Sequence, residues 1–230
     1  MNNIQTALAL LLEPKNAIGE IEARPRFLFP LLVTVLATAA VTFWYYSIVD
    51  MEWFIDQTIR ASSRAQGATE EQLAQSAQFM TPGVVKWWSV VVIILFTVGA
   101  RLLESIWYLL AGKVTNVQRS FKQWFALASW TSLPQLIVVL PAIPLLLMAK
   151  SSQLNPGSIS PLTLNELIFH RGIGEPGYSL FTTLNLVHIF TLYLAILGVK
   201  LWSGRSWLFA SVYVLLPIVV ICGIWALVAF

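Results

Sequence analysis

The chain alternates between long apolar stretches and shorter polar connections. A stretch of about 20 apolar residues is long enough to cross a hydrocarbon core of about 30 Å. Five stretches meet this length, at residues 27–49, 87–112, 125–148, 180–199 and 207–230. The pattern therefore predicts an all-α fold: a polytopic membrane protein whose residues 27–230 form five transmembrane helices in one bundle.

Residues 1–26 form a leader that is too short to add another span. Ile4, Ala7, Leu8, Leu11 and Leu12 recur at helical spacing, so we expect an amphipathic helix on the membrane surface, ended by Pro14. The run ALALLL is followed by Glu-Pro-Lys instead of a small-residue cleavage site, so no signal peptide is expected.

Two connections are long enough to have structure of their own. Residues 50–80 read as two helical pieces broken at Gly67, with Thr69 and Gln72 at capping-box spacing. This predicts a small external helical connection, and a solvated linker is the alternative. Residues 150–179 are rich in Pro, Gly and Ser and read as a loop with one helical turn at 162–169.

Positive charge is concentrated in the leader and in the second and fourth connections. These hold Lys15, Arg24, Arg26, Lys113, Arg119, Lys122, Lys200 and Arg205. Lysine and arginine are retained in short cytoplasmic loops. We therefore expect a cytoplasmic N-terminus and, with five spans, an external C-terminus.

Composition agrees with a membrane protein and argues against several other classes. The residues are 57% hydrophobic and 11% charged, far from the balance of a soluble domain. A net charge of +3 without a basic run does not indicate nucleic-acid binding. Cys222 is the only cysteine, which excludes an intrachain disulfide.

No catalytic motif is present, and His170 and His188 are the only histidines. We expect neither an enzyme nor a bound cofactor or metal. The expected partners are the lipid bilayer and other membrane proteins, or further copies of the chain.

Arg101 and Glu104 are two charges within the second predicted span. A charge at membrane depth is costly, and it usually faces other protein or a wet cavity and has a partner. Spacing of three places both side chains on one helix face. The sequence therefore predicts an internally facing, mutually compensating pair that determines how this span packs.

Other polar residues and prolines interrupt the third and fourth predicted spans. Pro134, Pro141 and Pro144 are expected to kink the third span, where Gln135 could bond across to a neighbour. Asn185 and His188 are three apart, hence on one helix face. The candidate intramembrane polar cluster is Arg101, Glu104, Gln135, Asn185 and His188, with either a packing role or a place in a polar route.

Three stretches together resemble the Yip family of five-span membrane proteins. These are LLEPKNAIGEIEARPRF, WYLLAGKVTNVQRSFKQWFALASWTSLPQLIVVL and LYLAILGVKLWSGRSWLFASVYVLLP. Eukaryotic members interact with Ypt/Rab GTPases and have a long cytosolic region with an Asp-Leu-Tyr-Gly-Pro motif. This chain has only about two dozen residues before the first span and lacks that motif. It looks like the bacterial branch, which implies the inner membrane, and the GTPase role is not transferred.

Two functions follow as alternatives. A non-enzymatic scaffold or adaptor that associates with other membrane proteins fits the resemblance and the lack of catalytic motifs. A small-solute or lipid translocator would use the polar residues of spans two to four as a route. We favour the scaffold, because a polar route should show more charged and polar residues.

Overall fold

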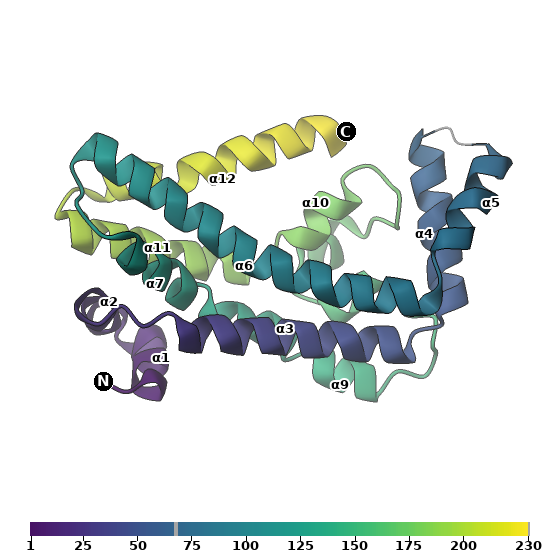
Figure 1. Cartoon of the computed structure of the whole chain (residues 1–230), viewed down its shortest axis with the longest axis horizontal. Helices are drawn as coiled ribbons and strands as arrows, with labels where there is room; N and C mark the ends of the chain where they lie inside the picture. Colours follow the sequence, from purple (N-terminus) through teal and green to yellow (C-terminus); the bar gives the residue numbers. More distant parts are fainter. Residues whose placement is uncertain (67–68, 230) are drawn as a thin grey trace. The chain divides into compact units, whose positions relative to one another are not determined.

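The computed structural model describes residues 1–66 and 69–229, and the predicted break at Gly67 and the last residue of the fifth predicted span, Phe230, lie outside them. The all-α prediction is confirmed: the described residues form helices and one isolated β-bridge, between Thr163 and Asn185. In chain order (Figure 1), the elements are α1 (Asn3–Leu12), α2 (Pro14–Ala23), α3 (Leu28–Ile48), α4 (Met51–Gln66), α5 (Glu70–Phe79), α6 (Pro82–Thr115), α7 (Phe121–Thr131), η1 (Leu133–Gln135), α8 (Leu136–Val139), α9 (Ala142–Leu147), η2 (Pro156–Ile159), η3 (Asn165–Phe169), α10 (Tyr178–Thr183), α11 (Val187–Ser203) and α12 (Trp207–Ala229).

The chain divides into two compact units, which we describe separately. Unit 1 comprises residues 1–36, 95–136 and 187–223, and unit 2 comprises residues 37–94, 137–186 and 224–230. Helices α3, α6 and α12 each contribute residues to both units. A single bundle over residues 27–230 stays a prediction.

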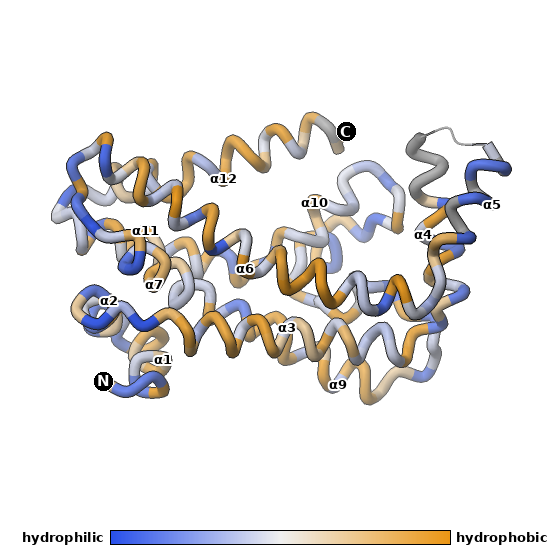
Figure 2. The backbone as a smooth tube through the Cα atoms, viewed as in Figure 1, coloured by the Kyte–Doolittle hydropathy of each residue, from blue (hydrophilic) through white to orange (hydrophobic). Residues whose placement is uncertain are grey.

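Four helical segments of the described chain are long and apolar enough to cross a membrane. They are Leu28–Ile48, Pro82–Thr115, Phe121–Leu147 and Trp207–Leu227. Much of α3, α6 and α12 is coloured as hydrophobic in Figure 2, whereas α2 is largely hydrophilic. The fifth candidate, α11, has 17 residues and is apolar but short. The count of five spans therefore stays a prediction.

The prediction of one continuous helix over residues 180–199 is wrong. Helix α10 ends at Thr183, Leu184 has an extended backbone, and α11 begins at Val187. The amide of Leu164 donates to the carbonyl of Leu184 at 2.8 Å, and that of Leu186 donates to Leu162 at 3.0 Å. The backbone of residues 184–186 is thus paired with the preceding connection, so it does not continue a helix.

The third predicted span is divided at its prolines. Helix α7 ends at Thr131, Pro134 lies in η1, and Pro141 directly precedes α9. Pro144 lies within the first turn of α9, where a missing amide hydrogen costs little. The helix is interrupted near Pro134 and Pro141 because proline has no amide hydrogen to donate to a carbonyl of the preceding turn.

The leader is part of the core of unit 1. Asn2 and Gln5 form a capping box that starts α1, with hydrogen bonds of 2.8 and 2.9 Å. Pro14 ends α1 but is also the first residue of α2, a helix that the sequence analysis did not predict. Leu10, Ile18 and Ile21 are almost fully buried, and α2 packs against α7 and α11.

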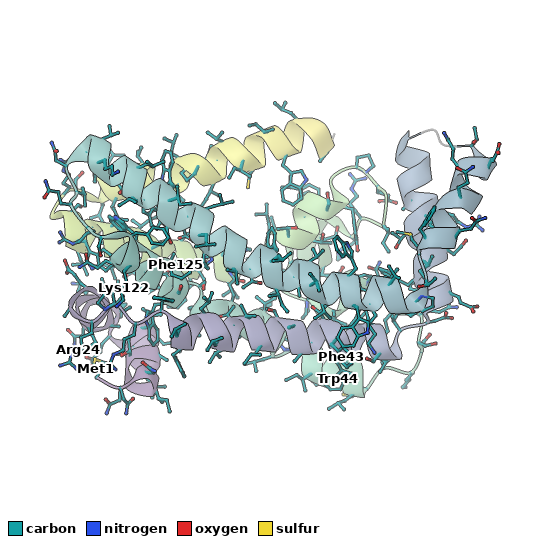
Figure 3. All side chains as sticks on the ribbon, viewed as in Figure 1. Met1, Arg24, Phe43, Trp44, Lys122 and Phe125 are labelled. Carbon is teal, nitrogen blue, oxygen red and sulfur yellow. The ribbon has the colours of Figure 1, made fainter. Side chains whose placement is uncertain are left out.

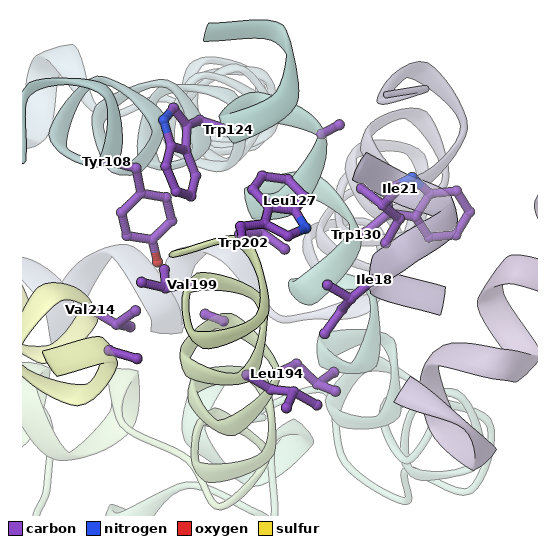
Figure 4. Packing of buried hydrophobic residues seen from close by; sticks show 14 of the residues in the cluster. Ile18, Ile21, Tyr108, Trp124, Leu127, Trp130, Leu194, Val199, Trp202 and Val214 are labelled. Carbon is purple, nitrogen blue, oxygen red and sulfur yellow. The ribbon is translucent and has the colours of Figure 1, made fainter. Parts of the chain in front are cut away.

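Aromatic side chains fill much of the remaining core of unit 1 (Figure 4). The ring of Trp124 lies 5.5 Å from that of Tyr108 and 5.2 Å from that of Trp202. Trp130 donates its indole hydrogen to the carbonyl of Arg26 at 2.6 Å. The leader, α6, α7 and α11 therefore share one apolar core.

Unit 2 has a smaller apolar cluster around Tyr45, Val49, Phe54 and Leu146. The Tyr45 hydroxyl donates to the carbonyl of Leu154 at 2.6 Å, which fastens the loop after α9 to α3. Residues 51–66 and 70–79 form α4 and α5. The connection is therefore helical over these described residues, as predicted, and its external location stays a prediction.

The second helix of that connection starts with the predicted cap. The amide of Thr69 donates to Gln72 Oε1 at 3.0 Å, and the amide of Gln72 donates to Thr69 Oγ1 at 3.4 Å. This reciprocal pair is the capping box that the spacing predicted.

Candidate functional site

The charged pair of α6 is in direct contact. Arg101 Nη1 lies 2.7 Å from Glu104 Oε2, which shows that the spacing of three residues brings the two side chains together. About a quarter of each side chain is exposed, at 26% for Arg101 and 23% for Glu104. The two charges thus compensate each other within the apolar middle of α6.

Two further groups hold the pair in place. The Tyr108 hydroxyl donates to Glu104 Oε1 at 2.7 Å, and Arg101 Nη1 lies 3.5 Å from the carbonyl oxygen of Ala128 in α7. Tyr108 and Ala128 are both almost fully buried. The pair is therefore connected to the core of unit 1 on its acidic side and to α7 on its basic side.

The other members of the predicted polar cluster lie on separate elements. Gln135 is half-buried in η1, and His188 is half-buried in the first turn of α11. Asn185 belongs to unit 2, where its backbone forms the bridge with Thr163. The prediction that Asn185 and His188 share one helix face is wrong, because the helix is interrupted between them.

The turn between α6 and α7 is tightly built. Asn116 follows the last residue of α6 with a φ of 58°, and the amide of Val117 donates back to the carbonyl of Gly112 at 2.9 Å. This is a Schellman-type helix end. Ser120 then starts α7 as its N-cap and forms a capping box with Gln123.

Two glycines in the stretches that resemble the Yip family lie at close contacts. A Cβ on Gly112 would lie 2.7 Å from the carbonyl oxygen of Val117. A Cβ on Gly198 would lie 2.6 Å from Leu127 Cδ1, where α11 packs against α7. Both positions need a residue without a side chain unless the neighbouring atoms shift.

Arg119 joins this turn to the leader and to α11. Its Nη2 lies 2.6 Å from Glu22 Oε1 and donates to the carbonyl of Trp202 at 2.9 Å. Gln123 Nε2 also donates to the carbonyl of Glu22, at 3.3 Å. From the sequence, Arg119 was expected only to mark the cytoplasmic side, because no local pattern indicates a partner 97 residues away.

Among the described residues, no group of three or more His, Cys, Asp or Glu side chains could hold a metal ion. His170 lies at the end of η3 with a φ of 50°. Two arrangements described above are therefore the candidates for a functional site: the Arg101–Glu104 pair, which is held by the core of unit 1, and the basic turn, which Arg119 joins to the leader.

Comparisons with known proteins identify the family. No curated protein matches the chain. No solved structure matches it either. A family model does match, that of the Yip1 domain, and it covers residues 8–229, from the first helix of the leader to the end of α12. Since this match extends over nearly the whole chain, the protein is a membrane protein that belongs to the Yip1 domain family.

Proposed function

We propose that this integral membrane protein is a non-enzymatic scaffold or adaptor that binds other membrane proteins or further copies of itself. We place it in a bacterial inner membrane, with the leader and the basic connections in the cytoplasm. The observation that carries the proposal is the self-contained arrangement of the intramembrane charges. Arg101 and Glu104 are satisfied by each other, by Tyr108 and by the backbone of α7.

Buried hydroxyl groups in unit 1 support the same view. Ser105 donates to Arg101 O at 2.6 Å, Ser129 to Phe125 O at 2.7 Å, and Thr131 to Leu127 O at 2.9 Å. Each hydroxyl is therefore bonded within its own helix. Polar groups that line a route for a solute are expected to face a shared wet space instead.

A small-solute or lipid translocator is the second candidate. It is favoured by the interruptions at residues 132–135 and 184–186, since discontinuous helices form the sites of many transporters. The two candidates differ in whether Arg101 and Glu104 are needed for movement of a substrate.

Site-specific photocrosslinking in cells tests the scaffold. A photoreactive residue at Lys122, which is exposed on the α6–α7 side of unit 1, should capture discrete protein partners. The matched control is Leu103, an exposed apolar residue of α6 that should face lipid and capture none. Identical adducts at both positions would contradict a specific partner surface.

Transport is measured in parallel with the purified protein in vesicles. We expect movement of small ions and of a fluorescent phospholipid to equal that of empty vesicles. Saturable movement that disappears in Arg101→Leu while the protein stays folded would contradict the scaffold and support the translocator.

A further inference from the structure

A cavity of about 480 Å³ opens where α6 meets α7. Two cations and four neutral polar side chains line it, together with two apolar residues and a glycine, and no carboxylate does. The lining residues are Leu109, Gly112, Lys113, Asn116, Val117, Gln118, Arg119, Ser120 and Gln123. Such a lining suits a ligand that carries negative charge and accepts hydrogen bonds.

Lys113 supplies the available positive charge of this cavity. Arg119 is already paired with Glu22, whereas Lys113 is exposed and forms no ion pair with any described carboxylate. Two of the carbonyls at the end of α6, which would repel an anion, already accept hydrogen bonds. Gly112 O accepts from Val117, and Thr115 O accepts from Arg205 Nη2 at 2.6 Å.

A buried donor lies directly behind the cavity wall. Trp124 is fully buried, and its Nε1 has no hydrogen-bond acceptor in the described part of the chain. This nitrogen is 3.7 Å from the point where a Cβ on Gly112 would lie. This group near Gly112 is therefore a donor and does not repel an anion in the cavity.

The surroundings of the cavity carry the same charge. The leader and residues 113–122 and 200–205 hold eight Lys or Arg and three Glu, an excess of five positive charges. Glu20 contacts both the amino group of Met1 and the side chain of Arg24. Met1 and Arg24 lie next to each other in Figure 3. Glu22 contacts Arg119. Two of the three leader carboxylates are thus already paired with cations.

An apolar surface leads away from the cavity along α6. Leu103, Leu110 and Val114 are 70%, 52% and 84% exposed and recur at helical spacing. Leu110 and Lys113 are three residues apart and hence neighbours on the helix surface. A ligand with its anionic group at Lys113 could therefore lay a hydrocarbon chain along this stripe.

We propose that this cavity binds the phosphate of an anionic phospholipid headgroup, with one acyl chain along the exposed apolar stripe of α6. The site lies at the end of a membrane-spanning segment, the depth at which headgroups occur. Lys113, with the polar side chains of the turn, contacts the phosphate, and Arg119, held by Glu22, forms the opposite wall.

The test compares lipids and soluble anions on the full-length protein in detergent. Binding of dioctanoyl phosphatidylglycerol, dioctanoyl phosphatidylcholine, glycerol phosphate and inorganic phosphate is measured by native mass spectrometry. Phosphatidylglycerol should bind most tightly. Lys113→Gln should weaken it about fivefold, the effect of one lysine near an anionic headgroup. The matched control, Lys122→Gln, removes an exposed charge of the same connection outside the cavity and should change binding less than about twofold.

A second variant keeps the test decisive if Lys113→Gln does not fold. Asn116→Gly removes a cavity side chain at a φ of 58°, which glycine adopts readily, and should weaken binding about threefold with the fold retained. Equal losses for Lys113→Gln and Lys122→Gln, or equal binding of phosphatidylcholine, would overturn the site. Glycerol phosphate or inorganic phosphate binding as tightly as the lipid would overturn the lipid as its ligand.

Discussion

Arg101 Nη1 and Glu104 Oε2 lie 2.7 Å apart on one face of α6, and Tyr108, one turn further on, donates to the same carboxylate. The three residues form a chain of charge-assisted contacts from the helix surface into the core of unit 1. A lone charge at this place would be costly, and the pair reduces this cost by remaining together.

Removing one partner of this pair should be worse than removing both. Arg101→Leu or Glu104→Leu leaves an uncompensated charge and should cost about 2 kcal/mol, because a quarter of each side chain is exposed. The double variant should lose less than either single variant. Thermal melts in detergent measure the three values.

An exposed pair provides the control. Arg60 Nε lies 2.8 Å from Asp56 Oδ1 in α4, and both side chains are at least half exposed. Arg60→Leu should change stability by about 0.5 kcal/mol or less. Additive losses for Arg101→Leu and Glu104→Leu would show that the two charges do not interact.

The glycines of α6 should respond differently to alanine. Gly112→Ala places a Cβ 2.7 Å from a backbone oxygen, so the helix end must shift and the protein should lose about 1–3 kcal/mol. Gly99→Ala, in open space within the same helix, should gain up to about 1 kcal/mol. Detergent melts of both variants check this, and equal effects would show that the Gly112 contact is relaxed at no cost.

Helix α1 should lie in the membrane interface. Ile4, Leu8, Leu11 and Leu12 are 48–79% exposed, whereas Leu10 of the same helix is fully buried in unit 1. In a Cys222→Ser background, a spin label at Leu8 should be in contact with lipid. A label at Lys15, an exposed residue of α2, should be in water and serves as the control. Two labels that are equally accessible to water would contradict an interfacial α1.

The N-terminus and the C-terminus should lie on opposite sides of the membrane. Reporter fusions after Gly112, after Gly204 and at the C-terminus should report cytoplasm, cytoplasm and exterior. Helix α11 has 17 residues, about 26 Å at 1.5 Å per residue, which is close to the thickness of the hydrocarbon core. A cytoplasmic C-terminus would contradict both the orientation and the count of five spans.

Local patterns were sufficient for several features of this protein. Apolar stretches identified the long helices, and spacing of three residues identified the contact between Arg101 and Glu104 and the capping box of Thr69 and Gln72. These features depend on residues within about one helical turn of each other. The sequence therefore contains the physical reason for each of them.

Other features depend on which distant segments meet, and only the tertiary structure decided them. Helix α2 is stabilised by burial against α7 and α11, and Arg119 finds Glu22 in the leader. The helix predicted from residue 180 is interrupted because residues 184–186 pair with residues 162–164. The pattern of apolar and polar residues within one segment does not indicate these contacts, because each of them joins residues that are far apart along the chain.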